Sequence, residues 1–232
     1  TGLYDMAEGK ISDTIFEKLG LKKELVPDIV KAGDFVGNTK GSRIEVLREL
    51  SIDVIPVCTH DTASALLMTE SFLDKDTMFL SCGTWSLIGS VVDRCIITKE
   101  AYDNSLTNEL GYNSQPMFFK NITGLYLLEK YKSQLEKRLR RSIAFDEITS
   151  YVQSTNQEYS LVDMDEEIFA REGIDVKEEI DNYIREHGGN VPDNDFDYFA
   201  IIYESMVAKY MEVKLHIEKI LNKNFKKLHM IG

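Results

Sequence analysis

The chain has 232 residues, of which 43% are hydrophobic and 28% are charged, a composition typical of a soluble globular protein rather than a disordered or fibrous one. Its 39 acidic residues against 27 basic residues produce a formal net charge of -12, which repels phosphate backbones and anionic membrane surfaces. We therefore expect neither nucleic acid nor a membrane as a partner.

The first part of the chain alternates helical and extended patterns. The run IDVIPVCT, residues 52–59, is rich in β-branched residues and almost continuously apolar, which predicts a strand buried on both faces. In chain order, the spacing of apolar residues and the turn residues predict a helix within 8–25 capped by Ser12 or Asp13 and ended by Gly20, a short helix over 42–50, the strand over 52–59, a helix from Asp61 through Met68, and a hairpin with strands Met78–Leu80 and Leu87–Val92.

The second part is more helical. The pattern predicts a strand that passes into a helix within 112–137 with Asn121 or Thr123 as its cap, a loop over 162–176, a helix over 176–188 closed by Gly188 and Gly189, a long helix within 193–222 that begins at an Asp or Asn cap, and a strand over 225–232. Strands, a hairpin and long helices in mixed order predict an α/β protein.

The cysteines indicate a reducing compartment. Cys58, Cys82 and Cys95 stand far apart, without a CxxC pair or a nearby histidine cluster, so we expect free thiols, no zinc site and a cytoplasmic location. The chain begins with Thr and ends at LHMIG, and we expect it to be a segment of a longer protein. The basic cluster KRLRRS, residues 137–142, is interpreted as the solvated face of a helix in preference to an anion site.

The segment THDT, residues 59–62, lies where a predicted strand gives way to a helix, which is where open α/β sheets tend to bind ligands. Asp61 could simply cap the helix, and spacing alone favours that role. A carboxylate near a helix N-terminus stays ionised, so Asp61 could also accept a proton. His60 has no histidine three or four residues away, so a bond to a hydroxylated ligand or a structural role is favoured over metal ligation.

Two further segments are candidates for binding. In SCGTWS, residues 81–86, Gly83 would let the backbone approach a ligand and Thr84 could offer its hydroxyl to a phosphate, although a plain turn is the default interpretation. In FKNITGLYLLEK, residues 119–130, Lys120 and Asn121 precede a helix whose N-terminus would attract anionic or polar ligand atoms. Spacing alone favours the alternative, an Asn cap beside an exposed Lys.

Five segments in this order, THDTASA, SCGTWSLIGS, TNELG, KNITGLYLLEKY and LHMIG, resemble the rhamnulokinases of the FGGY carbohydrate kinase family. The resemblance implies an actin-like ATPase fold, also described as ribonuclease H-like: an α/β architecture with a mixed sheet flanked by helices, here incomplete. Residues 1–73 would be the end of an N-terminal sugar-binding domain. Residues 74–232 would be most of a C-terminal ATP-binding domain, ending at its adenosine glycine loop.

The resemblance also implies a reaction, the transfer of a phosphoryl group from ATP to the 1-hydroxyl of L-rhamnulose, with Mg²⁺ as cofactor and no dedicated metal ligands assigned in this chain. The roles that it implies are Asp61 as catalytic base, His60, Asp61, Thr62 and Asn121 in sugar binding, and Gly83, Thr84, Glu129 and Gly232 in ATP binding. Glu129 departs from the glutamine that the family can place there, and a carboxylate repels a triphosphate unless a cation lies between them.

The resemblance places the family's N-terminal phosphate loop outside this chain, so we expect the 232-residue chain to be inactive alone. Two alternatives stay open. One is another ketose kinase of the same family, for fuculose or xylulose, and the other is a non-catalytic sugar-binding relative. The sequence assigns no oligomeric state.

Overall fold

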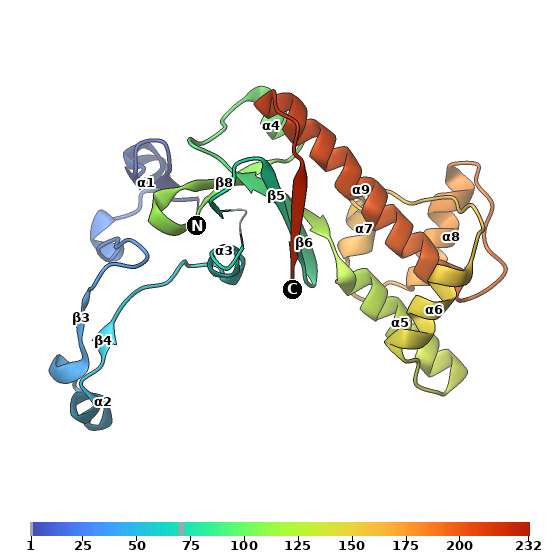
Figure 1. The fold of residues 1–232 in the computed structure, drawn as a ribbon, viewed down its shortest axis with the longest axis horizontal. Helices are drawn as coiled ribbons and strands as arrows, with labels where there is room; N and C mark the ends of the chain where they lie inside the picture. Colours follow the sequence, from blue (N-terminus) through green and yellow to red (C-terminus); the bar gives the residue numbers. More distant parts are fainter. Residues whose placement is uncertain (1, 70–71) are drawn as a thin grey trace. The chain divides into compact units, whose positions relative to one another are not determined.

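The computed structural model describes residues 2–69 and 72–232, and Figure 1 labels the elements along the chain. The strands are β1 Tyr4–Asp5, β2 Lys10–Ile11, β3 Gly37–Asn38, β4 Asp53–Val54, β5 Thr77–Cys82, β6 Trp85–Val91, β7 Thr107–Leu110, β8 Pro116–Thr123 and β9 Lys227–Ile231. The helices are α1 Asp13–Leu19, α2 Glu45–Leu50, α3 Asp61–Leu66, α4 Lys99–Asp103, α5 Leu125–Leu139, α6 Phe145–Ser154, α7 Glu167–Ala170, α8 Val176–Glu186 and α9 Asp197–Leu221. Short 3₁₀ turns lie at Lys23–Leu25, Thr39–Gly41 and Tyr112–Ser114.

The chain divides into two compact units. The first unit contains residues 1–79, 89–119 and 225–229, and the second contains residues 80–88, 120–224 and 230–232. A five-stranded sheet of order β7-β8-β6-β5-β9 supplies strands to both units. The sequence-based domain assignment, 1–73 and 74–232, stays a prediction.

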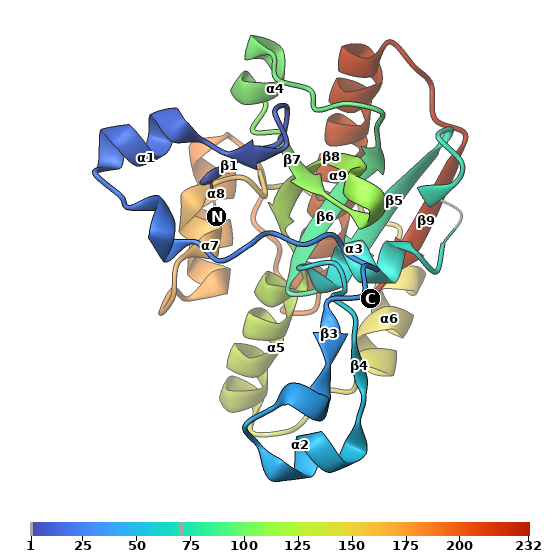
Figure 2. The same ribbon diagram turned by 90° about the vertical axis from the view of Figure 1, so that its left-hand side faces the viewer.

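In the first unit, β7 and β8 form an antiparallel pair in which Glu109 lies opposite Met117. Gly89 of β6 is required by close packing, because a Cβ there would lie 2.3 Å from the Cβ of Phe119 on β8. Phe119 in turn contacts Phe79 of β5, with ring centroids 6.2 Å apart. A separate two-stranded pair, β3 and β4, leads to and from α2, as Figure 2 shows.

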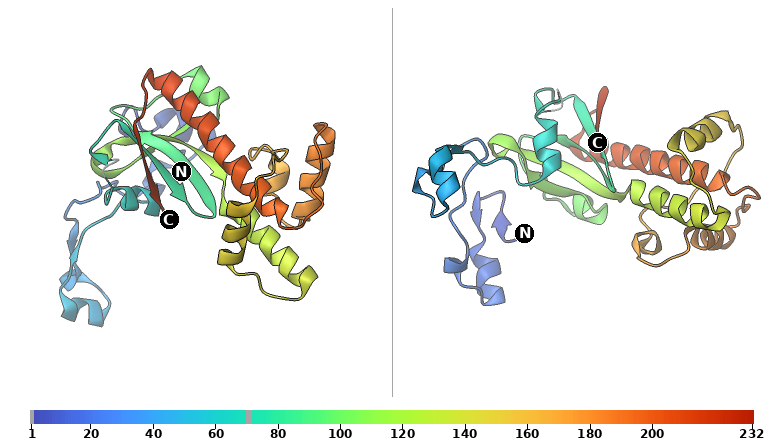
Figure 3. Two further views of the ribbon diagram at one scale, coloured as in Figure 1. Left: turned by 45° about the vertical axis from the view of Figure 1, so that its right-hand side comes forward. Right: turned by 90° about the horizontal axis from the view of Figure 1, so that it is seen from below.

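The second unit is mainly helical, and α5 and α9 run side by side in it (Figure 3). Its core is aromatic: Tyr131 of α5 lies with its ring centroid 5.4 Å from that of Tyr198 and 5.0 Å from that of Phe199, both on α9. All three side chains are fully buried. Burial raises the pKa of Tyr131 and of Tyr198, so both phenols stay neutral and act as hydrogen-bond donors.

Most sequence-based elements are confirmed. The hairpin forms as β5 and β6, joined through Gly83 and Thr84, and the strand-to-helix switch forms as β8 and α5. The helices predicted within 8–25, 42–50, 61–68, 176–188 and 193–222 and the final strand are also present. α4, β7 and α6 were not predicted, and the predicted loop 162–176 contains the one-turn helix α7. Within the described chain, no helix is both long enough and apolar enough to cross a membrane.

The prediction of a buried strand over 52–59 is wrong. Only Asp53 and Val54 are extended in a ladder, and they pair with β3 alone. The side chains of Ile55 and Val57 are 56% and 76% exposed. An apolar pattern shows that a segment can be buried, but burial requires neighbouring layers on both faces, and the described residues supply none here.

Several predicted caps are also wrong. Asn121 and Thr123 lie inside β8, and Gly124 occupies the cap position of α5. The long helix α9 has Phe196 at its cap position, while Asn194 accepts a hydrogen bond from the backbone N–H of Phe196. At α1 the prediction is confirmed: Ser12 holds the cap position, without a side-chain cap bond in the described structure, and Gly20 ends the helix in the left-handed conformation.

The basic cluster 137–142 has the predicted role of a solvated helix end. Arg138 lies 3.2 Å from the carboxylate of Asp195, and Arg141 donates to both carboxylate oxygens of Glu147 at 2.6 and 2.9 Å. These carboxylates satisfy the guanidinium groups, which argues against an anion site.

A buried charge network joins three segments of the second unit. Lys209 of α9 is 6% exposed, and its ammonium lies 2.7 Å from Asp163, 3.3 Å from Asp165 and 2.8 Å from Glu212. Asp165 also accepts a hydrogen bond from Lys120 of β8 at 2.6 Å. The network therefore ties the 163–165 loop to both α9 and β8.

The pKa values of Asp163 and Lys209 are shifted in opposite directions. Burial raises the pKa of the Asp163 carboxyl, but the hydrogen bond from Lys209 and further favourable contacts outweigh burial and lower it overall. Burial likewise lowers the pKa of Lys209, and its carboxylate partners raise it overall. The stabilisation from Asp163 is thus present above the ordinary Asp pKa of about 3.9 and is lost as the pH falls through the lowered value.

We predict that Asp163→Asn lowers the free energy of unfolding at pH 7 by about 1–2 kcal/mol, because a charge-assisted hydrogen bond to a largely buried ammonium is lost. Urea unfolding at pH 7 and at pH 3 measures the difference, which should shrink at pH 3. Asp103→Asn, which removes an exposed ion pair with Lys99 on α4, is the matched control and should change stability less. Equal effects of the two substitutions would contradict the prediction.

Candidate active site

Asp61 is the first residue of α3, and the cap position belongs to His60. The Oδ1 of Asp61 accepts a hydrogen bond from the backbone N–H of Thr62 at 2.7 Å. In the described structure the side chain of His60 makes no capping hydrogen bond to this helix. The interpretation of Asp61 as the helix cap is therefore wrong. The carboxylate is exposed and lies in the first turn, where a negative charge is favoured.

His60 contacts a residue that sequence reasoning missed. Its Nδ1 lies 2.8 Å from Oε2 of Glu109, which belongs to β7. The exposed fractions of the two side chains are 57% and 30%. Glu109 lies within TNELG, one of the segments that carry the family resemblance, and that segment was the available signal.

The predicted phosphate turn lies directly against the start of α5. The backbone N–H of Leu125 donates to the carbonyl of Gly83 at 3.1 Å, and that of Tyr126 donates to the carbonyl of Thr84 at 3.2 Å. These two N–H groups at the helix N-terminus are thus already used within the protein. The expectation that this N-terminus attracts a ligand is corrected to that extent.

Gly124 makes this contact possible. A Cβ at Gly124 would lie 2.7 Å from the backbone nitrogen of Ser86 and 2.8 Å from the carbonyl oxygen of Gly83. At Gly83 itself a Cβ would meet only the carbonyl oxygen of Trp85 at 3.5 Å, an ordinary contact. The packing therefore requires glycine at 124, whereas the described fold leaves space at 83.

Gly232 also reaches this turn. A Cβ there would lie 2.3 Å from the carbonyl oxygen of Cys82, and its φ of +147° is in the region that favours glycine. The structure thus brings together three of the predicted ATP residues, Gly83, Thr84 and Gly232. Ser86, two residues after Thr84, shares a hydrogen bond of 2.6 Å with Tyr210, and burial raises the pKa of the Tyr210 phenol and of the Cys82 thiol.

Thr84 lines a pocket of about 210 Å³ in the second unit, together with Trp85, Thr123, Tyr126, Ala170 and Glu172. Lys130 of α5 holds one wall of this pocket, because its ammonium donates to the carbonyl of Arg171 at 2.7 Å and lies 5.2 Å from the ring centroid of Tyr126. Glu172 is a pocket residue that the sequence analysis did not single out.

Two further predicted site residues, Asn121 and Glu129, do not line the Thr84 pocket. Asn121 is an exposed residue of β8, two positions before Thr123. Lys120 beside it is only 11% exposed and pairs with Asp165, so the interpretation of Lys120 as an exposed lysine is wrong. Glu129 lies on the exposed surface of α5 and is absent from the lining of the Thr84 pocket.

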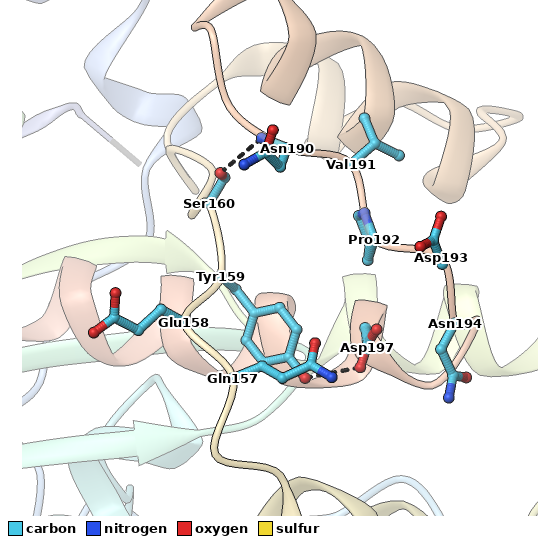
Figure 4. Close-up of a pocket in the computed structure, with 10 residues that line it drawn as sticks. All are labelled: Gln157, Glu158, Tyr159, Ser160, Asn190, Val191, Pro192, Asp193, Asn194 and Asp197. Atoms are coloured by element: carbon cyan, nitrogen blue, oxygen red, sulfur yellow. Dashed lines mark hydrogen bonds between the residues drawn. The ribbon is translucent and has the colours of Figure 1, made fainter.

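A second, polar hollow of about 480 Å³ lies at the start of α9 (Figure 4). Asp197 there accepts hydrogen bonds from the hydroxyls of Tyr151 at 2.7 Å and Tyr159 at 2.8 Å. The lining includes Glu158 and Asp193 and none of the predicted site residues. Among residues 2–69 and 72–232, no group of three or more His, Cys, Asp or Glu side chains could hold a metal ion.

Known proteins resemble the chain over its whole length. It is 30% identical over 232 residues to the rhamnulokinase of Halalkalibacterium halodurans, covering 100% of this chain and 48% of that protein. It is 28% identical to the rhamnulokinase of Bacteroides thetaiotaomicron, covering 96% and 44%. The chain therefore spans about half the length of the curated relatives it matches. No protein-family model matches it.

Solved structures agree on the fold. A xylulose kinase from Lactobacillus acidophilus superposes with a TM-score of 0.65 and 14% identity, over 100% of this chain and 45% of that one. A "xyloylose kinase" from Brucella ovis superposes with a TM-score of 0.67 at the same identity, over 100% and 46%.

The chain has the fold of the sugar kinases, the actin-like ATPase architecture that the resemblance implied. The curated proteins to which it is similar are rhamnulokinases, the group that its sequence motifs resemble.

We predict that Gly124→Ala lowers the free energy of unfolding by about 1–3 kcal/mol, because the added methyl group forces the Gly83–Thr84 turn away from α5. Gly83→Ala, at a position with room for a Cβ, is the matched control and should change stability little. Urea unfolding of both variants measures the difference. A Gly124→Ala variant as stable as Gly83→Ala would show that the turn does not depend on this contact.

Proposed function

We propose that this chain is part of an ATP-dependent kinase that phosphorylates L-rhamnulose at its 1-hydroxyl. The observation that carries the proposal is the similarity of the whole chain to proteins named rhamnulokinase. The geometry supports it in two places: an exposed carboxylate beside an exposed imidazole at the start of α3, and a threonine turn that lines a pocket in the second unit. We propose residues 1–73 as sugar-binding and 74–232 as ATP-binding.

In the proposed reaction Asp61 orients the sugar hydroxyl and accepts its proton. As the hydroxyl oxygen forms a bond to the γ-phosphorus of ATP, the bond from that phosphorus to the β–γ bridging oxygen breaks, and ADP leaves with the electron pair. Phosphoryl transfer needs mainly positioning and charge neutralisation from a protein. An exposed carboxylate in a helix's first turn is suited to the task because a negative charge is favoured there.

The other roles follow from the proposed reaction. His60, Thr62 and Asn121 would contact sugar hydroxyls. The Thr84 hydroxyl would contact a phosphate oxygen, while Gly83, where the fold leaves space for a close neighbour, and Gly232 would let the nucleotide approach the backbone. Glu129 is retained as an ATP-proximal position, although its exposed place on α5 adds no support.

The described residues do not form a protein cage for Mg²⁺. Magnesium is commonly bound by substrate phosphates and waters with one or two carboxylates, so the ion would be carried mainly by the nucleotide. When bound, it would neutralise the phosphate charge.

We predict that the 232-residue chain alone produces no ADP above background when it is given ATP, Mg²⁺ and L-rhamnulose. The expected reason is that it spans about half the length of its relatives, and the resemblance places the family's phosphate loop outside the chain. A coupled ADP-release assay measures the rate. Turnover at the rate of a full-length rhamnulokinase would contradict this prediction.

We predict that Asp61→Asn in the full-length protein lowers kcat about 100-fold or more, because a general base typically contributes that much, while the Kd for the sugar changes little. Asp53→Asn is the matched control, since Asp53 is an exposed carboxylate of the same unit. Steady-state kinetics and sugar titration are the measurements. Near-normal turnover of Asp61→Asn would contradict the assignment of Asp61 as the base. A higher kcat/KM for fuculose or xylulose than for L-rhamnulose would contradict the proposed substrate.

A further inference from the structure

The contact between His60 and Glu109 joins two segments that are distant in the sequence. His60 lies immediately before Asp61, in extended conformation with φ of -96° and ψ of 139°. Glu109 lies in the middle of β7 and opposite Met117 of β8. Both residues belong to the first unit, and the two side chains meet at 2.8 Å.

We propose that Glu109 is a positioning residue that holds His60 with its proton on Nδ1, so that Nε2 is presented to the ligand as a hydrogen-bond acceptor. An ionised carboxylate can only accept hydrogen bonds, so the nitrogen that faces it must carry a proton. In a neutral imidazole the other nitrogen is then an acceptor. The protonation of Nε2 is therefore set by Glu109, a residue that need not touch the ligand.

The strand that carries Glu109 is firmly held. The side chain of the preceding residue, Asn108, donates to the carbonyl of Ile96 and accepts from its backbone N–H, both at 2.9 Å. Pairing with β8 fixes the strand from the other side. Because its own position is constrained, a carboxylate on such a strand can favour one tautomer of the histidine that it contacts.

A purely stabilising role explains the pair poorly. An ion pair between side chains as exposed as these contributes little to stability, and in the described structure the imidazole provides no cap bond to α3. The ring is instead held beside the residue proposed as the base. An acceptor at this place would bind one sugar hydroxyl and so help select which neighbouring hydroxyl faces Asp61.

This last consequence rests on the proposed function, whereas the tautomer does not. We therefore test the two separately, the tautomer with the 232-residue chain as it stands and the ligand with the full-length protein. Long-range ¹H–¹⁵N NMR at pH 8.5, well above the ordinary histidine pKa of about 6.5, reports the protonated nitrogen of each imidazole. His60→Asn identifies the His60 signals among those of the four histidines.

We expect His60 to carry its proton on Nδ1, Glu109→Ala to move the population towards the Nε2-protonated form, and Glu109→Gln to restore much of the original state, because its amide carbonyl can still accept. Glu49→Ala, which removes an exposed carboxylate of α2 in the same unit, should change nothing at His60. An unchanged His60 tautomer in a folded Glu109→Ala variant, or Nε2 protonation in the unmodified chain, would overturn the proposal.

Titration of the full-length protein with L-rhamnulose then tests the ligand. Binding at His60 that weakens about tenfold in Glu109→Ala and less than threefold in Glu109→Gln supports positioning of the acceptor. Equal weakening in both variants would overturn it, because only the loss of charge would then matter. If the tautomer depends on Glu109 but millimolar sugar leaves the His60 signals unmoved, the positioning role is supported and the proposed sugar site fails.

Discussion

The contact between the Gly83–Thr84 turn and the start of α5 is the constraint around which the second unit is arranged. Two backbone hydrogen bonds of 3.1 and 3.2 Å join them, and the absence of a side chain at Gly124 leaves just enough room for both. Because the helix N-terminus donates to the turn, two hydrogen bonds hold the turn beside the pocket that Thr84 lines. Gly232, which follows β9, packs against Cys82 at the start of the same turn. Segments that are distant in the sequence therefore meet at this turn.

The loops around this turn are held by charge rather than by regular structure. Lys209 and Lys120 fasten the 163–165 loop, and Lys130 fastens the segment at Arg171 that forms a wall of the Thr84 pocket. A buried or partly buried ammonium is costly unless carboxylates or carbonyls satisfy it. Such contacts specify one loop position, and phosphoryl transfer depends on positioning more than on covalent work by the protein.

The first unit applies the same principle to a titratable side chain. Asp61 enters the first turn of α3, where a negative charge is favoured, without serving as its cap. His60, which holds the cap position, directs its ring to Glu109 instead. A histidine with one nitrogen engaged is a more selective partner for a ligand hydroxyl than a freely rotating ring. Asp61, the proposed proton acceptor, and His60, which is suited to orienting the ligand, thus have separate roles.

Sequence pattern was enough to predict the hairpin at Gly83 and Thr84, the passage from β8 to α5 and the long helix α9, and the order of motifs indicated the family that the chain resembles. These features depend on periodicity and on residues close together in the chain. Only the folded chain shows that Glu109 contacts His60, that the packing of Ser86 requires glycine at 124, that Lys120 pairs with Asp165 and that Ile55 and Val57 are exposed. Each of these depends on which distant segments become neighbours, and local pattern carries no information about that choice.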